Sequence, residues 1–133
     1  MRRILLVDDQ THIRKVAELA LRTLECDLLT AEDGQEAWDV IQAKRPDLLV
    51  TDVQMPRMNG IELLRLIRTS PEFASLPVIL LTAKGFELST EDRAFCATCQ
   101  LVCKPFSPAA LARDVKQALE RLEAPAAAVG VTN

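Results

Sequence analysis

Residues 48–60 read LLVTDVQMPRMNG, an apolar run that ends at the carboxylate of Asp52 and continues into a loop marked by proline and glycine. A run rich in Leu and Val without polar alternation is typical of a strand that is buried on both faces. We therefore expect Asp52 to emerge at the C-terminal edge of a parallel sheet, which is where open α/β sheets bind their ligands.

Similar apolar runs recur along the chain, separated by segments with helical spacing. Strands are predicted at residues 4–7, 28–29, 48–50, 78–81 and 101–103. Helices are predicted to follow Thr11, Gly34 and Ser107, to begin at Gly60, and to lie somewhere between Phe86 and Ala97. Strict alternation of strands and helices predicts an α/β fold with right-handed crossovers and helices on both faces. The expected architecture is a flavodoxin-like, doubly wound, five-stranded parallel sheet of order 2-1-3-4-5 with five helices.

The apolar positions of the first helix predict one stripe that faces the sheet. Its members are Ile13, Val16, Ala17, Ala20, Leu21 and Leu24. Thr11 is the predicted N-cap of this helix. Ser107 is the predicted cap of the last helix, with Pro108 in its first turn. Trp38, on an apolar helix face, is expected in the core, and His12 is expected to be a partly exposed polar residue rather than a ligand.

Length and composition indicate one globular domain. The chain has 133 residues, 49% of them hydrophobic and 26% charged, and a net charge of -3. This acidic balance disfavours a dedicated nucleic-acid or anionic-membrane binder, so proteins and small molecules are the expected partners. No segment suits a signal peptide or a membrane span, which predicts a cytoplasmic protein whose cysteines are reduced. Residues 1–123 form the expected domain, and residues 124–133 read as a flexible tail or linker stub.

Five polar residues follow or end the predicted strands and should meet at one edge of the sheet. They are Asp8, Asp9, Asp52, Thr82 and Lys104. Three carboxylates crowded there repel each other by about 4 kcal/mol per pair at ~4 Å and an effective dielectric of about 20, so a hard divalent cation is expected. Mg²⁺ is bound through few carboxylates plus phosphate and water. Asp52 would then act as a nucleophile toward a phosphoryl group, with Lys104 and Thr82 contacting the phosphoryl oxygens.

The chain closely resembles the receiver domain of two-component response regulators, the CheY-like family, over residues 3–122. The motifs that carry the resemblance are VDD at residues 7–9, DVQMPRMNGIELL at 52–64, LTA at 81–83 and KPF at 104–106. It implies that Asp52 is the phosphoacceptor, and that Thr82 and Lys104 bind the phosphoryl group. It also implies that Mg²⁺ is held by Asp8, Asp9, Asp52 and the backbone carbonyl of Gln54, and that the bond between Lys104 and Pro105 is cis.

The implied function is a phosphorylation-dependent signalling switch rather than an enzyme with a turned-over substrate. A sensor histidine kinase or a phosphotransfer protein would supply the phosphoryl group. An output protein would bind the face formed by the fourth helix, the fifth strand and the fifth helix, with no direct role for nucleic acid or membrane. The chain departs from the family at Leu101, where the family usually has an aromatic residue that reports phosphorylation. We therefore expect phosphorylation to be coupled more weakly to this output face.

Other functions need residues that are different from those present. An aspartate-nucleophile phosphohydrolase normally has a second acid two residues after the nucleophile, and this chain has Gln54 there. A nucleotide or flavin site would need a glycine-rich phosphate loop, but the chain has four glycines and none are clustered. Cys96 and Cys99 have the spacing of a redox or metal pair, yet ordinary thiols are the expected state, as for Cys26 and Cys103.

Overall fold

Strands and helices alternate along the part of the chain that the computed structural model describes, residues 2–55, 57–82 and 99–123. In chain order they are β1 (Arg2–Val7), α1 (Thr11–Leu21), β2 (Cys26–Ala31), α2 (Gly34–Lys44), β3 (Leu48–Asp52), α3 (Gly60–Thr69), β4 (Val78–Thr82), β5 (Gln100–Cys103) and α5 (Pro108–Glu123). The five strands therefore lie where the sequence predicts them. The helix predicted between Phe86 and Ala97 and the predicted tail at residues 124–133 lie outside the described residues.

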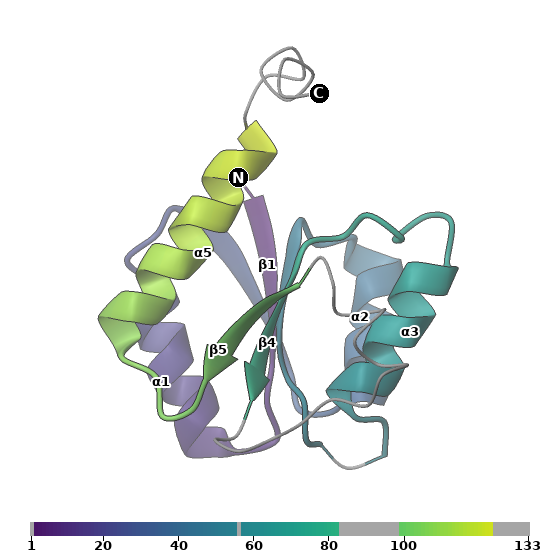
Figure 1. Ribbon diagram of the computed structural model, residues 1–133, viewed down its shortest axis with the longest axis horizontal. Coiled ribbons are helices and arrows are strands. Elements are labelled where there is room, and N and C mark those ends of the chain that lie inside the picture. The colour runs from purple at the N-terminus through teal and green to yellow at the C-terminus, as the bar shows by residue number, and fades with distance from the viewer. Residues whose placement is uncertain (1, 56, 83–98, 124–133) are drawn as a thin grey trace.

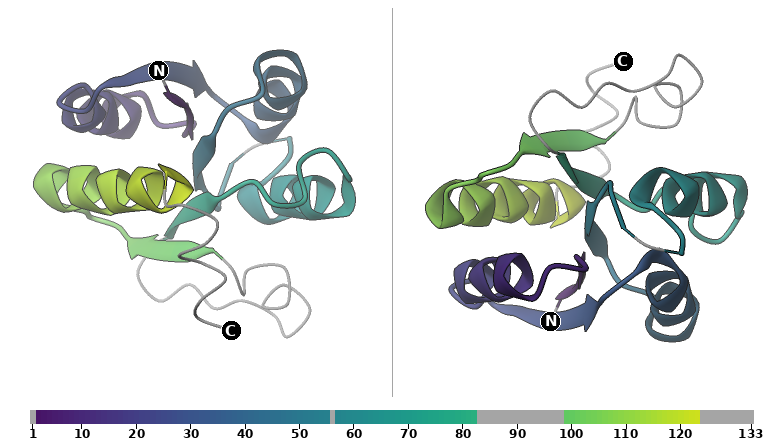
Figure 2. Two further views of the ribbon diagram at one scale, coloured as in Figure 1. Left: turned by 90° about the horizontal axis from the view of Figure 1, so that it is seen from above. Right: turned by 90° about the horizontal axis from the view of Figure 1, so that it is seen from below.

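The five strands form one parallel sheet of order β2-β1-β3-β4-β5, as predicted. Helices α1 and α5 cover one face, and α2 and α3 cover the other (Figures 1 and 2). This arrangement confirms the doubly wound α/β class. None of the helices in the described ranges is long and apolar enough to cross a membrane.

The central strands are buried on both faces, which explains their uninterrupted apolar runs. In β1, Ile4 and Leu6 pack with α1 and α5, whereas Leu5 and Val7 pack with α2 and α3, and all four are fully buried. Burial of this kind on both sides stabilises each Leu or Ile by roughly 1.5–3 kcal/mol. The uniform apolar composition of the strands therefore follows from the two layers of helices around them.

Three helix starts agree with the sequence and one does not. Helices α2 and α3 begin at Gly34 and Gly60. α5 begins at Pro108, and the Ser107 hydroxyl accepts a hydrogen bond from the Ala110 N–H at 3.3 Å, as expected of a cap. The prediction for Thr11 is wrong: Gln10 is the N-cap of α1, without a side-chain cap, and Thr11 is the first helical residue.

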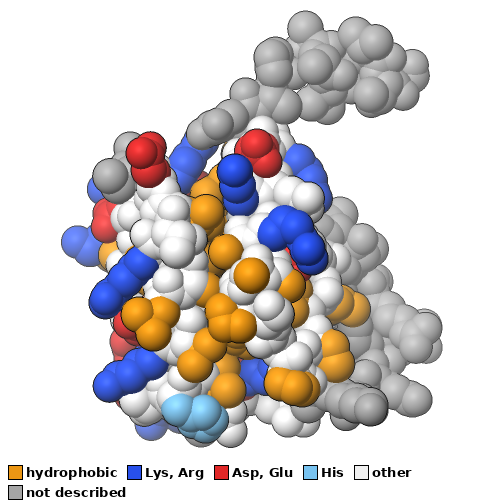
Figure 3. All heavy atoms as spheres, turned by 90° about the vertical axis from the view of Figure 1, so that its left-hand side faces the viewer, with side chains coloured by type: hydrophobic (Ala, Val, Ile, Leu, Met, Phe, Trp, Pro, Cys, Tyr) orange, Lys and Arg blue, Asp and Glu red, His pale blue; other side chains and the backbone are white. Residues whose placement is uncertain are grey.

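The stripe predicted for α1 is only partly buried. Ala17, Ala20 and Leu21 are buried. Val16 is 38% exposed, and Leu19 in the same helix is 64% exposed. Exposed apolar side chains gather on this side of the molecule, where α1 and α5 lie side by side (Figure 3). The small side chains of α5 near its start, such as those of residues 109 and 112, do not reach across the groove. Leu19, which lines this groove, therefore stays in contact with solvent.

The expectations for Trp38 and His12 are confirmed. Trp38 is half-buried against the core and meets Phe73 edge-to-face, with ring centroids 6.0 Å apart. His12 is exposed. Of the cysteines that the structure describes, which leave out residue 96, none forms a disulfide.

Candidate functional site

The C-terminal ends of four parallel strands, β1, β3, β4 and β5, bring the predicted polar residues together. Asp52 and Thr82 are the last residues of β3 and β4. Asp8 and Asp9 follow β1, and Lys104 follows β5. The register pairs Asp52 with Leu81 and the end of β4 with the end of β5, so these strand ends lie level with one another. The convergence that the sequence predicts is therefore present.

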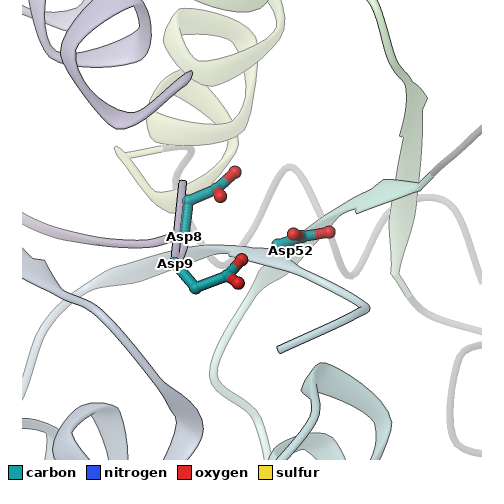
Figure 4. A group of neighbouring side chains, drawn as sticks. All are labelled: Asp8, Asp9 and Asp52. Atoms are coloured by element: carbon teal, nitrogen blue, oxygen red, sulfur yellow. The ribbon is translucent and has the colours of Figure 1, made fainter. Parts of the chain in front are cut away.

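Three carboxylates form an acidic cluster at this edge (Figure 4). One oxygen each from Asp8, Asp9 and Asp52 lies within 4.8 Å of the other two. Asp8 is fully buried and Asp52 is 6% exposed, whereas Asp9 is exposed. Hard divalent cations prefer carboxylate oxygens as ligands, and a site that is open on one side leaves room for water or phosphate oxygens. The donor set thus fits such a cation.

Lys104 contacts two of the three carboxylates. Its Nζ atom lies 3.0 Å from Asp8 Oδ2 and 3.1 Å from Asp52 Oδ2. Three ionised carboxylates and one ammonium leave two negative charges on these four residues. A divalent cation would balance that charge. A dianionic phosphoryl group would then be attracted by both the cation and the Lys104 ammonium.

Burial and neighbouring charges shift the pKa values of the two central groups. Burial raises the pKa of the Asp52 carboxyl, and the charge of Asp8 adds to this against the opposing charge of Lys104. Burial alone would lower the pKa of Lys104, but its contacts with Asp8 and Asp52 outweigh burial and raise it. Lys104 is therefore a firmly protonated ammonium, and a cation next to Asp52 would favour its ionised form.

The loops after β1 and β3 hold the acidic side chains by backbone hydrogen bonds. The Gln10 N–H donates to Asp8 Oδ1 at 2.9 Å, and the Gln54 N–H donates to Asp52 Oδ1 at 3.3 Å. Gln54 lines the same pocket as Asp9, Gln10, Asp52 and Lys104. The predicted backbone ligand thus belongs to the walls of the site.

The β4 and β5 sides of the site are joined through the backbone. The Lys104 N–H donates to the Thr82 carbonyl oxygen at 2.7 Å, and Thr82 is half-buried. The peptide bond between Lys104 and Pro105 is cis, as the resemblance implied. Thr82 therefore lies beside the lysine at the end of the sheet.

Arg14 is a residue of the site that the sequence did not single out. Its Nη1 atom donates to the Asp8 carbonyl oxygen at 2.8 Å, and Nη2 lies 3.5 Å from Glu32. The guanidinium thus supports the turn that carries Asp8 and Asp9. A basic residue in the first turns of α1, six positions after Asp8, is the signal that could have indicated this role.

Comparisons with known proteins point to one family. Residues 4–116 match the family described as the response regulator receiver domain. The chemotaxis protein CheY homolog of Campylobacter jejuni is 32% identical over 120 residues, which cover 88% of this chain and 92% of that protein. The phosphate regulon transcriptional regulatory protein PhoB of Pseudomonas aeruginosa is 36% identical over 118 residues, or 89% of this chain, and this chain spans only about half of its length, 52%.

A solved structure shows the same likeness in three dimensions. The chemotaxis response regulator CheY4 of Vibrio cholerae superposes with a TM-score of 0.78 at 30% identity, covering 88% of this chain and 98% of that one. The likeness thus extends from the sequence to the fold.

Proposed function

The chain belongs to the response regulator receiver domain family, and from that premise we propose that it is a phosphorylation-dependent switch in which Asp52 accepts the phosphoryl group. Mg²⁺ would be held by Asp8, Asp9, Asp52 and the backbone carbonyl of Gln54. Lys104 and Thr82 would bind the phosphoryl oxygens. The observation that carries the proposal is the position of Asp52, whose carboxylate lies both in the acidic cluster and 3.1 Å from the Lys104 ammonium.

The proposed reaction is one phosphoryl transfer to a carboxylate. An oxygen of Asp52 forms a bond to phosphorus while the bond from phosphorus to the donor atom breaks, and the electron pair of that bond leaves with the donor. The Lys104 ammonium stands where negative charge collects on the phosphoryl oxygens, and the Thr82 hydroxyl donates a hydrogen bond to one of them. Bound Mg²⁺ would neutralise the remaining carboxylate charge.

The partners follow from the family. Receiver domains interact with histidine kinases and with output partners. Here the donor would be a sensor histidine kinase or a phosphotransfer protein, in the cytoplasm. The output protein would bind the face that includes β5 and α5, where Leu101 is 53% exposed; the fourth helix of that face lies outside the described residues. Residues 1–123 would act as a single-domain regulator or as the receiver part of a longer protein.

A phosphohydrolase with the same nucleophile is the rival from the enzyme class. Such an enzyme needs a group that protonates a poor leaving group, and an amide cannot do so. Gln54 holds that position, two residues after Asp52. The wall of the site thus favours a phosphoacceptor over an enzyme that turns over phosphomonoesters.

Intact-mass measurement after incubation with acetyl phosphate and Mg²⁺ tests the proposal. One phosphoryl group should appear on the wild type, and none should appear on Asp52→Asn or when EDTA is present. Asp39→Asn, which removes an exposed carboxylate from α2, is the matched control and should react like the wild type. Incorporation that persists in Asp52→Asn, or that does not need Mg²⁺, would rule out the assignment.

A further inference from the structure

The loop between β3 and α3 determines where the proposed backbone ligand lies. It begins directly after Asp52, includes Gln54 and ends at Gly60. At its far end the Gly60 N–H donates to the Val53 carbonyl oxygen at 2.8 Å, and a Cβ atom on Gly60 would collide with the Asp52 carbonyl. The loop is therefore closed onto the end of β3 by backbone contacts that only glycine permits.

The middle of the loop is fastened to the start of α2. Arg57 Nε donates to Asp33 Oδ2 at 3.0 Å, and Arg57 Nη2 contacts the same oxygen. Beside this ion pair, the Gly34 N–H donates to the Met58 carbonyl oxygen at 3.1 Å. These contacts join two loops that are 24 residues apart in the sequence.

Asp33 is a fixed anchor for this contact. The residue is 4% exposed, and its Oδ1 accepts the hydrogen bond from the Glu36 N–H at 2.8 Å that caps α2. α2 in turn packs on the core through Ala37 and Ile41, both fully buried. The hydrogen bond from Glu36, followed by that from Arg57, lowers the pKa of Asp33. The carboxylate is thus held in place by the helix and stays ionised.

The backbone of Arg57 has a left-handed conformation, with φ of 65°. A non-glycine residue keeps such a conformation only where its surroundings enforce it, and such residues gather at functional sites. The other described arginine of this kind, Arg45 with φ of 49°, follows the last turn of α2, where left-handed residues are ordinary. Arg57 lies at no helix end, so a helix terminus does not explain its left-handed conformation.

We propose that the Arg57–Asp33 ion pair holds the β3–α3 loop in the conformation that presents Gln54 to the cation, which makes Arg57 a positioning residue for Mg²⁺ binding. This inference rests on the proposed function, since it presumes a cation in the acidic cluster. Arg57 is not itself a ligand in this proposal. It acts by fixing the backbone conformation of the β3–α3 loop, which carries Gln54. Groups that orient metal ligands in this way typically change metal affinity by about 10- to 100-fold when they are removed.

Two substitutions break the contact without removing other interactions of its members. Arg57→Gly removes the guanidinium, leaves Asp33 its hydrogen bond from the Glu36 N–H, and accommodates the positive φ without backbone strain. Asp33→Asn removes the charge but keeps a side-chain oxygen that is suited to cap α2. Arg45→Gly is the matched control, because Arg45 is also left-handed and paired, with Glu72 at 2.7 Å, but precedes β3 at the opposite edge of the sheet.

Titration of the unphosphorylated proteins with MgCl₂, followed by calorimetry or amide NMR shifts, gives the readout. Arg57→Gly and Asp33→Asn should each weaken Mg²⁺ binding on the order of tenfold. The double variant should bind no more weakly than the single ones, because both act through one contact. Arg45→Gly should bind like the wild type, and thermal unfolding in EDTA should show that the Arg57→Gly variant is folded.

Three results would overturn the inference. They are Mg²⁺ binding by Arg57→Gly within about twofold of the wild type, losses that multiply in the double variant, and failure of both single variants to fold, which would make the contact purely structural. A wild type that does not bind Mg²⁺ would instead refute the proposed function, and the inference with it.

Discussion

Replacing Asp52 by asparagine should stabilise the metal-free protein against unfolding at neutral pH. The substitution keeps the size of the side chain and an oxygen that can accept the hydrogen bond from the Gln54 N–H, which lies 3.3 Å from Asp52 Oδ1. It removes one of three carboxylates that approach within 4.8 Å of each other. Lys104 keeps its ion pair with Asp8 at 3.0 Å. The substitution therefore lowers the repulsion without leaving the lysine unpaired.

The magnitude follows from the charges around Asp52. Repulsion from Asp8 and from Asp9, at distances up to 4.8 Å, is worth about 3 kcal/mol each at an effective dielectric of about 20. Attraction to Lys104 at 3.1 Å is worth about 5 kcal/mol on the same scale. The difference of about 1 kcal/mol favours removal of the charge, and the cost of burying that charge adds to it. We expect the free energy of unfolding to rise by about 1–2 kcal/mol, or the melting temperature by about 5 °C.

The effect should depend on pH with a defined sign. Burial, together with the charge of Asp8 and against that of Lys104, raises the pKa of Asp52, so the folded state holds this proton more tightly than the unfolded chain. The stability of the wild type therefore falls as the pH rises from the ordinary pKa of aspartate through the raised pKa. Asp52→Asn lacks this fall. The two proteins should differ at neutral pH and become alike toward the acidic end of the range.

Urea denaturation in EDTA, repeated across pH and with saturating Mg²⁺, measures this difference. With Mg²⁺ the advantage of the variant should shrink or reverse, because the cation stabilises whichever protein binds it more tightly. Asp39→Asn should leave the midpoint unchanged. A variant that is less stable than the wild type in EDTA at neutral pH would show that the Lys104 attraction exceeds the repulsion, and the charge imbalance that favours a cation would then be wrong.

Three other properties of the site can be measured with equally simple assays. Lys104→Met should lower the free energy of unfolding in urea by about 3 kcal/mol, because it leaves the buried charge of Asp8 without its ion-pair partner; an unchanged midpoint would contradict that role. The wild type should show negligible turnover of p-nitrophenyl phosphate, since Gln54 offers no general acid, and steady hydrolysis that Asp52→Asn abolishes would favour the phosphohydrolase. Leu101→Tyr should enlarge the amide NMR shifts along β5 and α5 that a phosphoryl mimic causes, because a Tyr ring can rotate and hydrogen-bond where Leu can only repack. If the wild type already shows a large shift that the substitution leaves unchanged, Leu101 does not limit coupling.

Most of the fold and the identity of the acidic cluster could be predicted because their signals are local. An uninterrupted apolar run indicates a strand buried on both faces, and the observed burial of Leu5 and Leu6 on opposite sides of β1 is the physical cause of that pattern. Alternation with helices then leaves few topologies. Since all strands are parallel, Asp8, Asp52 and Lys104 had to meet at one edge, and this followed without any knowledge of distances.

The sequence by itself determined the order of the strands, the edge that carries the site and the residues gathered there. Only the tertiary structure decided that Lys104 pairs with Asp8, 96 residues away, and that Arg57 pairs with Asp33. It also decided that Leu19 stays exposed, because the part of α5 across the groove presents small side chains there. Periodicity and capping depend on neighbours within a few positions of the chain, whereas these contacts depend on how separate elements pack and which rotamers the packing allows.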